Sequence, residues 1–470
     1  MTKPARPFDP HWITELPLLA AYLDELCCEL TSAETRGRRR SEDAQANFEA
    51  AIKAIVLDLF RADESDPNLE VGIATGQGTL QKRGASRYGA RLLSPRSFRA
   101  AMDALLGNGQ VIKTTSHWDD PTGKNSRTAR YQASPDLLTG LREAGASLAF
   151  LRRHGGVEGI HLKDEKKNLV EYGEIRFANE ARDGLKIIND MLESHWADLE
   201  MPDDELVEWK AKVRGNRDDE AEQSFDFAAR TVHRVFNNND WEQGGRFYGA
   251  WWISAPSGLR RYILIDGKRT VEVDYSGLHA AMLFAEQGLP IPADPYERCL
   301  SETGNRDERS LVKQTFNALL NANSVNAINP IDGYSEDLTG KSWKDFKHHI
   351  VHCFPEFHHQ FGSAVGLRLQ YKDSQLAEIV MKKFAAMQYS CLPVHDSFIV
   401  HYQLQGELTE AMQSAFEKMF GARGSVKLKI GYIEQVEPLT VSIGLDLEML
   451  NSPPGYEVRL QQFWNHQSQK

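Results

Sequence analysis

The sequence contains no apolar run long enough to cross a lipid bilayer, which takes about 20 predominantly apolar residues. An apolar-rich stretch at residues 16–30 is interrupted by Asp24, Glu25 and Glu29. The first residues of the chain offer no apolar core followed by a small-residue cleavage site, so no secretion signal is expected. These absences argue against a membrane-inserted protein and predict a cytoplasmic location.

Cysteine is scarce and is not spaced for metal or disulfide chemistry. The five cysteines of this 470-residue chain include no CxxC pair, which disfavours a zinc ribbon, a disulfide framework and redox chemistry. A histidine-rich stretch around His349 and Cys353 is interrupted by Pro355 and lacks further ligands at zinc spacing. A Gly-x-x-x-x-Gly-Lys-Ser/Thr loop is also missing. We therefore expect reduced thiols, no zinc site and no P-loop.

Positive charge is in deficit over the whole chain, with 55 Lys and Arg against 66 Asp and Glu and a net charge of −11. Such a chain does not coat DNA by bulk charge, although local basic patches can still bind phosphate. The 41% hydrophobic and 26% charged residues are ordinary for a folded chain. The places where positive charge gathers therefore matter more than its total.

Positive charge gathers first between residues 82 and 130, which hold ten basic and three acidic residues. Ser94 and Pro95 are typical of a helix start, and Gly107 begins a Gly-Asn-Gly stop. Strand-like residues 111–115, a polar turn and a returning strand at residues 129–132 follow. A helix followed by a basic hairpin resembles a winged helix-turn-helix.

That resemblance implies contacts to duplex DNA. The helix would bring Arg96 and Arg99 to a groove. The wing would bring Lys124, Arg127 and Arg130 to backbone phosphates. A winged helix that binds protein, or a solvated basic face, remains the alternative.

Two aspartates follow predicted strands in the C-terminal half. The stretch TVEVDYSGLH reads as a strand that ends at Asp274, with a helix after it, and CLPVHDSFIVH reads as a hairpin with Asp396 at its tip. Phosphoryl transfer by two metal ions needs such a pair, because the cations lie about 3.5–4 Å apart. The sequence therefore predicts that Asp274 and Asp396 form a metal pair.

A helix between these aspartates offers cations and amides on one face. Arg309, Lys313, Asn317 and Asn321 recur every four residues, which places them on the same side of a helix. An arginine can fork onto phosphate oxygens and a lysine can supply a point charge, so this face suits a triphosphate. Upstream, a Gly-Gly turn carries Arg246 with an aromatic neighbour, a combination that suits backbone contact and stacking.

Five segments in order carry a family resemblance: GGRFYG, RRYILIDG, VEVDYSGLHAAML, RSLVKQTFNALLNA and LPVHDSFIV. Over residues 240–450 they resemble the single-subunit right-hand polymerases, both the polymerase-I-like family A DNA polymerases and the phage-type RNA polymerases. The Asp-Tyr-Ser motif resembles the DNA enzymes. The Gly-Arg-Phe-Tyr and His-Asp-Ser motifs resemble the RNA enzymes more.

The resemblance implies a role for each matching residue. Asp274 and Asp396, with the Tyr275 carbonyl, would hold two Mg²⁺ ions, for which Mn²⁺ can substitute. The implied roles in nucleotide binding belong to Arg309 and Lys313, which grip the triphosphate with Lys313 also protonating pyrophosphate, and to Asn317, Asn321, His279 and Tyr275. The implied nucleic-acid contacts are His395 on the primer terminus and Arg246 with Tyr248 on the template-primer backbone.

The sequence departs from the family pattern in two places. His279 stands five residues after the first aspartate, where the DNA polymerases carry the glutamate that gates against a 2′-hydroxyl. Asn321 and Ala322 stand where both branches carry Tyr-Gly beside the nascent base pair. The preference for deoxynucleotides or ribonucleotides therefore stays open.

The predicted fold class is α+β, a right-hand polymerase palm with helical thumb and fingers after a winged helix-turn-helix-like domain. The expected division is a DNA-binding domain at residues 1–150, a helical thumb-like segment at 151–240, the first part of the palm at 241–294, a fingers-like helical insertion at 295–385, and the second part of the palm with a tail at 386–470.

The predicted function is template-directed nucleotidyl transfer, by a DNA polymerase or primase-polymerase or an RNA polymerase, for replication or priming of a mobile element. The expected partners are a DNA template-primer, nucleoside triphosphates and, through the N-terminal domain, duplex DNA. One alternative is a non-catalytic DNA-binding protein with a decayed palm, and another is template-independent nucleotide addition.

Overall fold

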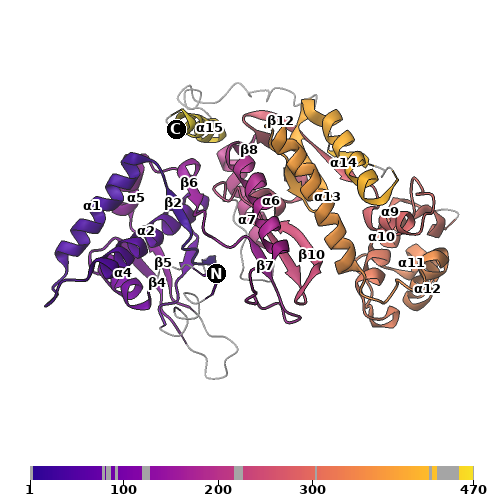
Figure 1. The fold of residues 1–470 in the computed structure, drawn as a ribbon, viewed down its shortest axis with the longest axis horizontal. Coiled ribbons are helices and arrows are strands. Elements are labelled where there is room, and N and C mark those ends of the chain that lie inside the picture. The colour runs from indigo at the N-terminus through magenta and orange to yellow at the C-terminus, as the bar shows by residue number, and fades with distance from the viewer. Residues whose placement is uncertain are drawn as a thin grey trace.

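The computed structural model describes residues 4–76, 80, 86–89, 94–118, 128–215, 226–301, 304–422, 426–430 and 455–468. Helices and strands are mixed along the whole length, so the α+β class is confirmed at that level. Figure 1 shows an N-terminal part in indigo, separated from a C-terminal part in which the sheet is flanked by the long helices α13 and α14. No helix among the described residues is long and apolar enough to cross a membrane.

The N-terminal part packs helices against a small sheet with strand order β1-β3-β5-β4. In it, β1 runs parallel to β3 and the other pairs are antiparallel. Its elements are β1 (Ala5–Pro7), β2 (Trp12–Thr14), α1 (Pro17–Ala33), α2 (Glu42–Ser65), β3 (Glu70–Gly72), α4 (Pro95–Gly107), β4 (Val111–Thr115), β5 (Arg130–Ala133) and α5 (Pro135–Glu143).

The predicted helix and hairpin of this part are present. The Ser94 side chain accepts a hydrogen bond from the Ser97 amide at 3.2 Å, and Pro95 occupies the first turn of α4. The apolar stripe of α4 packs against α2, and β4 and β5 pair behind it. The expected polar turn between the two strands lies outside the described residues.

Residues 151–240 hold more strand than the sequence analysis predicted. This segment contains two helices, as its predicted helical character implies, but short strands alternate with them. Strand β8 joins the large C-terminal sheet by pairing with β11. Most of these strands have three residues, which is too short for the alternation of apolar and polar residues to be recognised in a charge-rich stretch. The elements are β6 (Leu151–Arg153), β7 (Ile160–Leu162), α6 (Arg176–Glu193), β8 (Ala197–Leu199), α7 (Asp203–Gly215) and β9 (His233–Asn237).

The C-terminal part is built on a sheet of order β13-β14-β12-β11-β8, with β15 paired to β12 as well. Helices α10 to α13 separate β12 from β13 in sequence, and the described residues of 295–385 contain no strand. The elements are β10 (Asp240–Tyr248), α8 (Ser257–Arg260), β11 (Ile263–Ile265), β12 (Lys268–Tyr275), α9 (Leu278–Glu286), α10 (Arg306–Asn321), α11 (Glu336–Thr339), α12 (Trp343–Cys353), α13 (Gly366–Ala386), β13 (Leu392–Val394), β14 (Ser397–His401), α14 (Gln405–Phe420), β15 (Val426–Ile430) and α15 (Gly455–Gln467).

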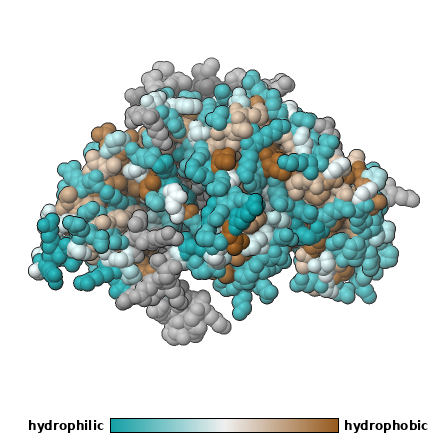
Figure 2. All heavy atoms as spheres, viewed as in Figure 1, coloured by the Kyte–Doolittle hydropathy of each residue, from teal (hydrophilic) through white to brown (hydrophobic). Residues whose placement is uncertain are grey.

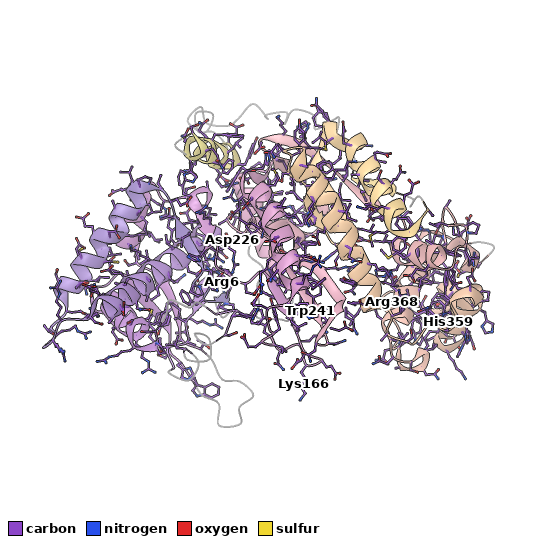
Figure 3. The ribbon with its side chains drawn as sticks, viewed as in Figure 1. Arg6, Lys166, Asp226, Trp241, His359 and Arg368 are labelled. Carbon is purple, nitrogen blue, oxygen red and sulfur yellow. The ribbon has the colours of Figure 1, made fainter. Side chains whose placement is uncertain are left out.

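A buried network of ion pairs in the N-terminal part reaches the rest of the chain through Arg61 and Asp226. Arg6 donates two hydrogen bonds of 2.9 Å to the Asp58 carboxylate, and Arg61 bridges Asp58 to Asp226 at 2.8 and 2.5 Å. Figure 3 places the labelled Arg6 and Asp226 at this junction. The face shown in Figure 2 is mostly hydrophilic, with hydrophobic residues in separate patches.

Candidate active site

The two predicted metal-binding aspartates lie on adjacent strands. Asp274 pairs in register with Ser397 across β12 and β14, and the Tyr275 amide donates to the Asp396 carbonyl at 3.4 Å. Residues directly opposite each other on antiparallel strands have Cα atoms about 4.5–5.5 Å apart. Asp274 and Asp396 are both half-buried at this strand end. The fold therefore brings together two carboxylates that are far apart in the sequence.

His395 and Asp396 form the tight turn between β13 and β14. His395 has a positive φ of 58°, which is uncommon for a residue with a side chain, and it is exposed. Its ring lies 6.3 Å from the Tyr248 ring, centroid to centroid, at the end of β10. His395, predicted to contact the primer terminus, and Tyr248, predicted to contact the nucleic-acid backbone, thus form one aromatic edge beside Asp396.

A buried hydrogen-bond network supports the β12–β14 pair. It is centred on Glu272, two residues before Asp274 on the same strand. Glu272 accepts hydrogen bonds from Arg260 at 2.8 and 3.1 Å and from the Ser397 hydroxyl at 2.7 Å. Glu272 and Ser397 are almost fully buried. The sequence analysis missed the role of Glu272, although a glutamate among the valines of an apolar strand is a signal for a buried partner.

Asp373 is a third carboxyl group that sequence reasoning missed. It is 1% exposed on α13, and the Arg246 side chain donates a 2.6 Å hydrogen bond to it. Burial raises the pKa of Asp373 to about 7, Arg246 opposes that shift, and the charges of Asp396 and Asp274 add to it. Its signal in the sequence is an acidic residue on the apolar face of α13. Arg246, predicted to contact nucleic acid, therefore contacts Asp373 here.

His279 lies in the first turn of α9. Its Nε2 atom is buried and has no hydrogen-bond partner among the described residues. Burial lowers the pKa of His279 to about 4, the positive charges of Arg246 and Lys313 lower it further, and Asp396 opposes them. His279 is therefore neutral near pH 7 and lies within electrostatic range of both the strand carboxylates and α10.

The predicted cationic face of α10 is present. Its opposite face supplies buried residues at Leu311, Val312, Thr315, Phe316, Leu319 and Leu320. Arg309 is ion-paired with Asp294, which raises the pKa of Arg309. Within the described part of the chain, Lys313 has no carboxylate partner and no side-chain hydrogen bond. Lys313 is thus the cation of this face that is available to a ligand.

The amides of the same face are less available. The Asn321 side chain donates to the Asn317 carbonyl at 2.8 Å. It also lies against Gly366 at the start of α13, where an added Cβ would come within 2.0 Å of the Asn321 Oδ1 atom. Asn317 is half-buried. Asn321 therefore takes part in the contact between α10 and α13.

The Tyr275 side chain points away from the carboxylates. Its hydroxyl donates to the Met412 carbonyl at 2.6 Å, and its ring lies against Phe416 of α14. Because the side chain is 2% exposed, only the main chain of Tyr275 can face a ligand. This is compatible with the predicted use of its carbonyl.

The predicted DNA-binding cations of the N-terminal part are only partly described. Arg96 is exposed on α4, and Arg99 donates to the Thr75 carbonyl at 2.8 Å. Lys124 and Arg127 lie outside the described residues.

The donor set at the strand end suits magnesium better than a metal held entirely by protein side chains. The described residues contain no group of three or more His, Cys, Asp and Glu side chains that could hold a metal ion. Mg²⁺ does not require such a group, since it keeps several waters and is commonly bound by one or two carboxylates together with substrate phosphates. Asp274 and Asp396 therefore fit a Mg²⁺ ion whose other ligands are water or substrate oxygens.

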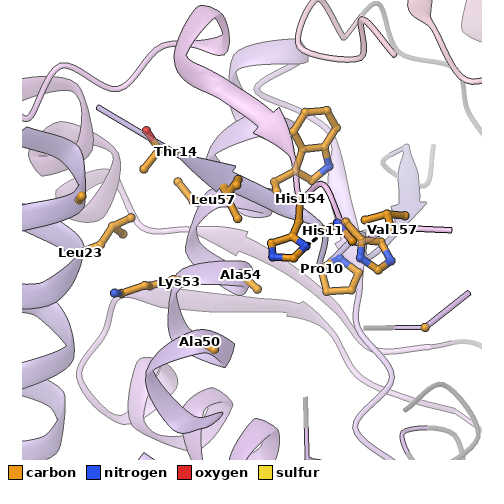
Figure 4. A pocket seen from close by; sticks show the side chains of 15 residues that line it. Pro10, His11, Thr14, Leu23, Ala50, Lys53, Ala54, Leu57, His154 and Val157 are labelled. Atoms are coloured by element: carbon orange, nitrogen blue, oxygen red, sulfur yellow. Dashed lines mark hydrogen bonds between the residues drawn. The ribbon is translucent and has the colours of Figure 1, made fainter. Parts of the chain in front are cut away.

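A separate cavity of about 520 Å³ lies in the N-terminal part, between β2 and the helices α1 and α2. Figure 4 shows Leu23, Ala54 and Leu57 on its apolar wall and His11 and His154 at one side. None of the predicted site residues lines it.

No protein-family model matches this chain, and no curated protein is similar to it. Among solved structures, it is similar to the POL domain of Pol1 from M. smegmatis in complex with DNA primer-template and dNTP. That likeness has 13% sequence identity, covers 88% of this chain and 81% of that chain, and has a TM-score of 0.30. Since a likeness at this level does not carry an assignment, the proposed function rests on the geometry of the site.

Proposed function

We propose that this chain is a template-directed nucleotidyltransferase that extends a 3′-hydroxyl and releases pyrophosphate. One observation carries the proposal. Asp274 and Asp396 stand at the ends of paired strands, and the pKa of His279 is influenced both by the charge of Asp396 and by that of Lys313 on α10. A pair of carboxylates near a cation is the arrangement that phosphoryl transfer by two metal ions uses, and this supports the proposal.

Asp274, Asp396 and the Tyr275 carbonyl would hold two Mg²⁺ or Mn²⁺ ions. When bound, such a pair activates the attacking hydroxyl and stabilises the leaving oxygen. Lys313 neutralises the triphosphate and donates a proton to the departing pyrophosphate oxygen. Arg309 joins it by exchanging Asp294 for a phosphate, because guanidinium binds both anions in the same bidentate manner. His395 and Tyr248 offer an aromatic edge to the primer terminus.

We propose that the N-terminal part is a winged-helix-like module that binds duplex DNA through α4 and the β4–β5 hairpin. Its exposed Arg96 and its neighbour Arg99 support this assignment. The double charge reversal Arg96→Glu/Arg99→Glu is expected to weaken duplex binding and to reduce the slope of log K against log salt by about 0.9 for each phosphate that the protein no longer neutralises. Fluorescence anisotropy at several salt concentrations measures both, and an unchanged slope would contradict the assignment.

Extension of a labelled primer on a DNA template tests the nucleotidyl transfer. Separate reactions hold dNTPs or NTPs, with Mg²⁺ or Mn²⁺, and compare the wild-type protein with Asp274→Asn/Asp396→Asn. The matched control is Asp332→Asn, which removes an exposed carboxylate from the loop before α11. Template-dependent growth that the double variant loses and the control keeps supports the proposal. Growth without a template indicates the template-independent alternative, and duplex binding without extension indicates a DNA-binding scaffold.

A further inference from the structure

Two cysteines far apart in the sequence meet beside α10. Cys299 ends a short helix, η3 (Glu297–Cys299), and Cys353 is the last residue of α12. The Cys353 sulfur lies 3.6 Å from the carbonyl oxygen of Arg298 and 3.6 Å from Nε2 of His349. That same His349 nitrogen lies 2.9 Å from the Cys299 carbonyl oxygen. The fold thus brings the Cys353 thiol to the main chain of residues 298 and 299 and into hydrogen-bond range of the Cys299 thiol, a pairing that cysteine spacing alone does not reveal.

The surroundings of the pair favour a thiolate on Cys353. Hydrogen bonding with the Cys299 thiol lowers the pKa of Cys353 most, and Arg298, Lys341 and His352 lower it further against an opposing effect of burial. The same hydrogen bond and burial raise the pKa of Cys299. The C-terminal end of α12 disfavours a negative charge, and the neighbouring cations oppose this effect.

The two thiols also differ in access. Cys353 is half-exposed, whereas Cys299 is 1% exposed. A half-exposed thiol of lowered pKa beside a buried thiol is the arrangement in which one sulfur attacks and the other resolves. Cys28 supplies an internal comparison, because it is more exposed than Cys353 and lies on α1 in the N-terminal part of the chain.

We propose that Cys353 and Cys299 form a reversible redox-modification site that reacts with low-molecular-weight disulfides. The Cys353 thiolate attacks one sulfur of glutathione disulfide, which breaks the S–S bond, forms a Cys353–glutathione mixed disulfide and releases glutathione thiolate. Cys299 then loses its proton and attacks the Cys353 sulfur, which forms the internal disulfide and releases the second glutathione. The two electrons lost by the cysteines reduce glutathione disulfide, and a dithiol reverses both steps.

The position of the pair gives the modification a target. Asp294 and Tyr296 precede η3, and both contact Arg309 of α10, Asp294 as an ion pair and the Tyr296 ring at 5.6 Å. The internal disulfide would fix the 294–299 segment to α12 and hold Asp294 in place. Nucleotide would then reach Arg309 less easily. This effect rests on the proposed function, whereas the redox site itself does not.

Thiol mapping on the reduced full-length protein tests the site without an activity assay. Limiting iodoacetamide near pH 7, followed by peptide mass spectrometry, is expected to label Cys353 before Cys28. Glutathione disulfide is expected to give a Cys299–Cys353 disulfide that dithiothreitol removes. In Cys299→Ala the mixed disulfide on Cys353 persists and alkylation slows several-fold, whereas Cys28→Ala leaves both results unchanged.

Cys299→Ser serves as a second variant that keeps the size and a hydrogen-bond donor, and circular dichroism reports whether each variant folds. Labelling of Cys28 ahead of Cys353, or wild-type protein that forms no internal disulfide with glutathione disulfide, would overturn the proposal. Because these readouts are masses, they stand apart from failure of the nucleotidyl-transfer assay.

Discussion

The strand side and the helix side of the candidate site are built in different ways. On the strand side, Arg260 and Glu272 beneath the aspartates have side chains only 9% and 1% exposed. On the helix side, the ion pair of Arg309 with Asp294 is 32% and 29% exposed. Buried charges are costly to separate, whereas an ion pair on the surface contributes about 0–1 kcal/mol.

This difference indicates which side is fixed before a ligand arrives. The strand ladder and the buried network hold the main chain that carries Asp274 and Asp396, and under the proposed function these carboxylates would bind cations with little rearrangement. On α10, Arg309 can exchange its partner Asp294 at low cost, because their ion pair is partly exposed. We therefore expect the strand side to determine the chemistry and the helix side to determine how nucleotide enters.

The largest expected contrast is in activity. Asp396→Asn is expected to lower the rate of primer extension by about 10³-fold, because a metal ligand supplies several kcal/mol of transition-state stabilisation. Lys313→Gln is expected to lower it by about 10- to 100-fold, since it removes one charge-assisted hydrogen bond to phosphate. Single-turnover extension at saturating nucleotide measures both rates. A larger decrease in Lys313→Gln than in Asp396→Asn would reverse the assignment of the two sides.

The second contrast is in stability. Glu272→Gln is expected to cost about 3–5 kcal/mol of unfolding free energy, because it leaves Arg260 buried without a negative partner. Glu286→Gln is the matched control, since it breaks a half-exposed pair with Arg368, labelled in Figure 3, and is expected to cost less than about 1 kcal/mol. Urea unfolding followed by circular dichroism compares them. Equal decreases in stability would show that the strand side is not fixed by its buried network.

The local elements could be predicted from the sequence, both at the candidate site and in the N-terminal part. Ser94 and Pro95 mark the start of α4, the alternating valines mark β12, and four-residue spacing marks the polar face of α10. Short-range rules suffice there, because caps, alternation and helical period depend on neighbours in the chain.

The contacts between these elements could not be predicted in the same way. Asp373 pairs with Arg246 across 127 positions, Asp294 holds Arg309, and Cys299 meets Cys353 only because α12 packs on η3. Each depends on how helices are placed in three dimensions, which no local pattern encodes. A charged residue on an apolar face, as at Asp373, signals that a partner exists but does not identify it.

A smaller effect is expected on nucleotide binding. Asp294→Asn removes the negative partner of Arg309 and is expected to lower the KM for nucleotide by about two- to five-fold, on the scale of about 1 kcal/mol for a surface pair. Asp307→Asn, an exposed carboxylate in the first turn of α10, is the control that leaves the pair intact. Steady-state extension at varied nucleotide concentration gives both KM values. A raised KM in Asp294→Asn would mean that Asp294 orients Arg309 instead of competing for it.

The smallest expected effect tests whether the two sides face each other at all. His279 has a pKa lowered to about 4. Lys313 on the helix side lowers this pKa, and Asp396 on the strand side raises it. Removing the positive charge in Lys313→Gln is expected to raise the pKa of His279, and removing the negative charge in Asp396→Asn to lower it, each by a few tenths of a unit. NMR titration of isotope-labelled histidine measures these shifts, with His279→Gln to assign the signal. Opposite signs require both charges to lie near one imidazole, whereas a shift in only one variant would separate α10 from the carboxylates and remove the geometry on which the proposed function rests.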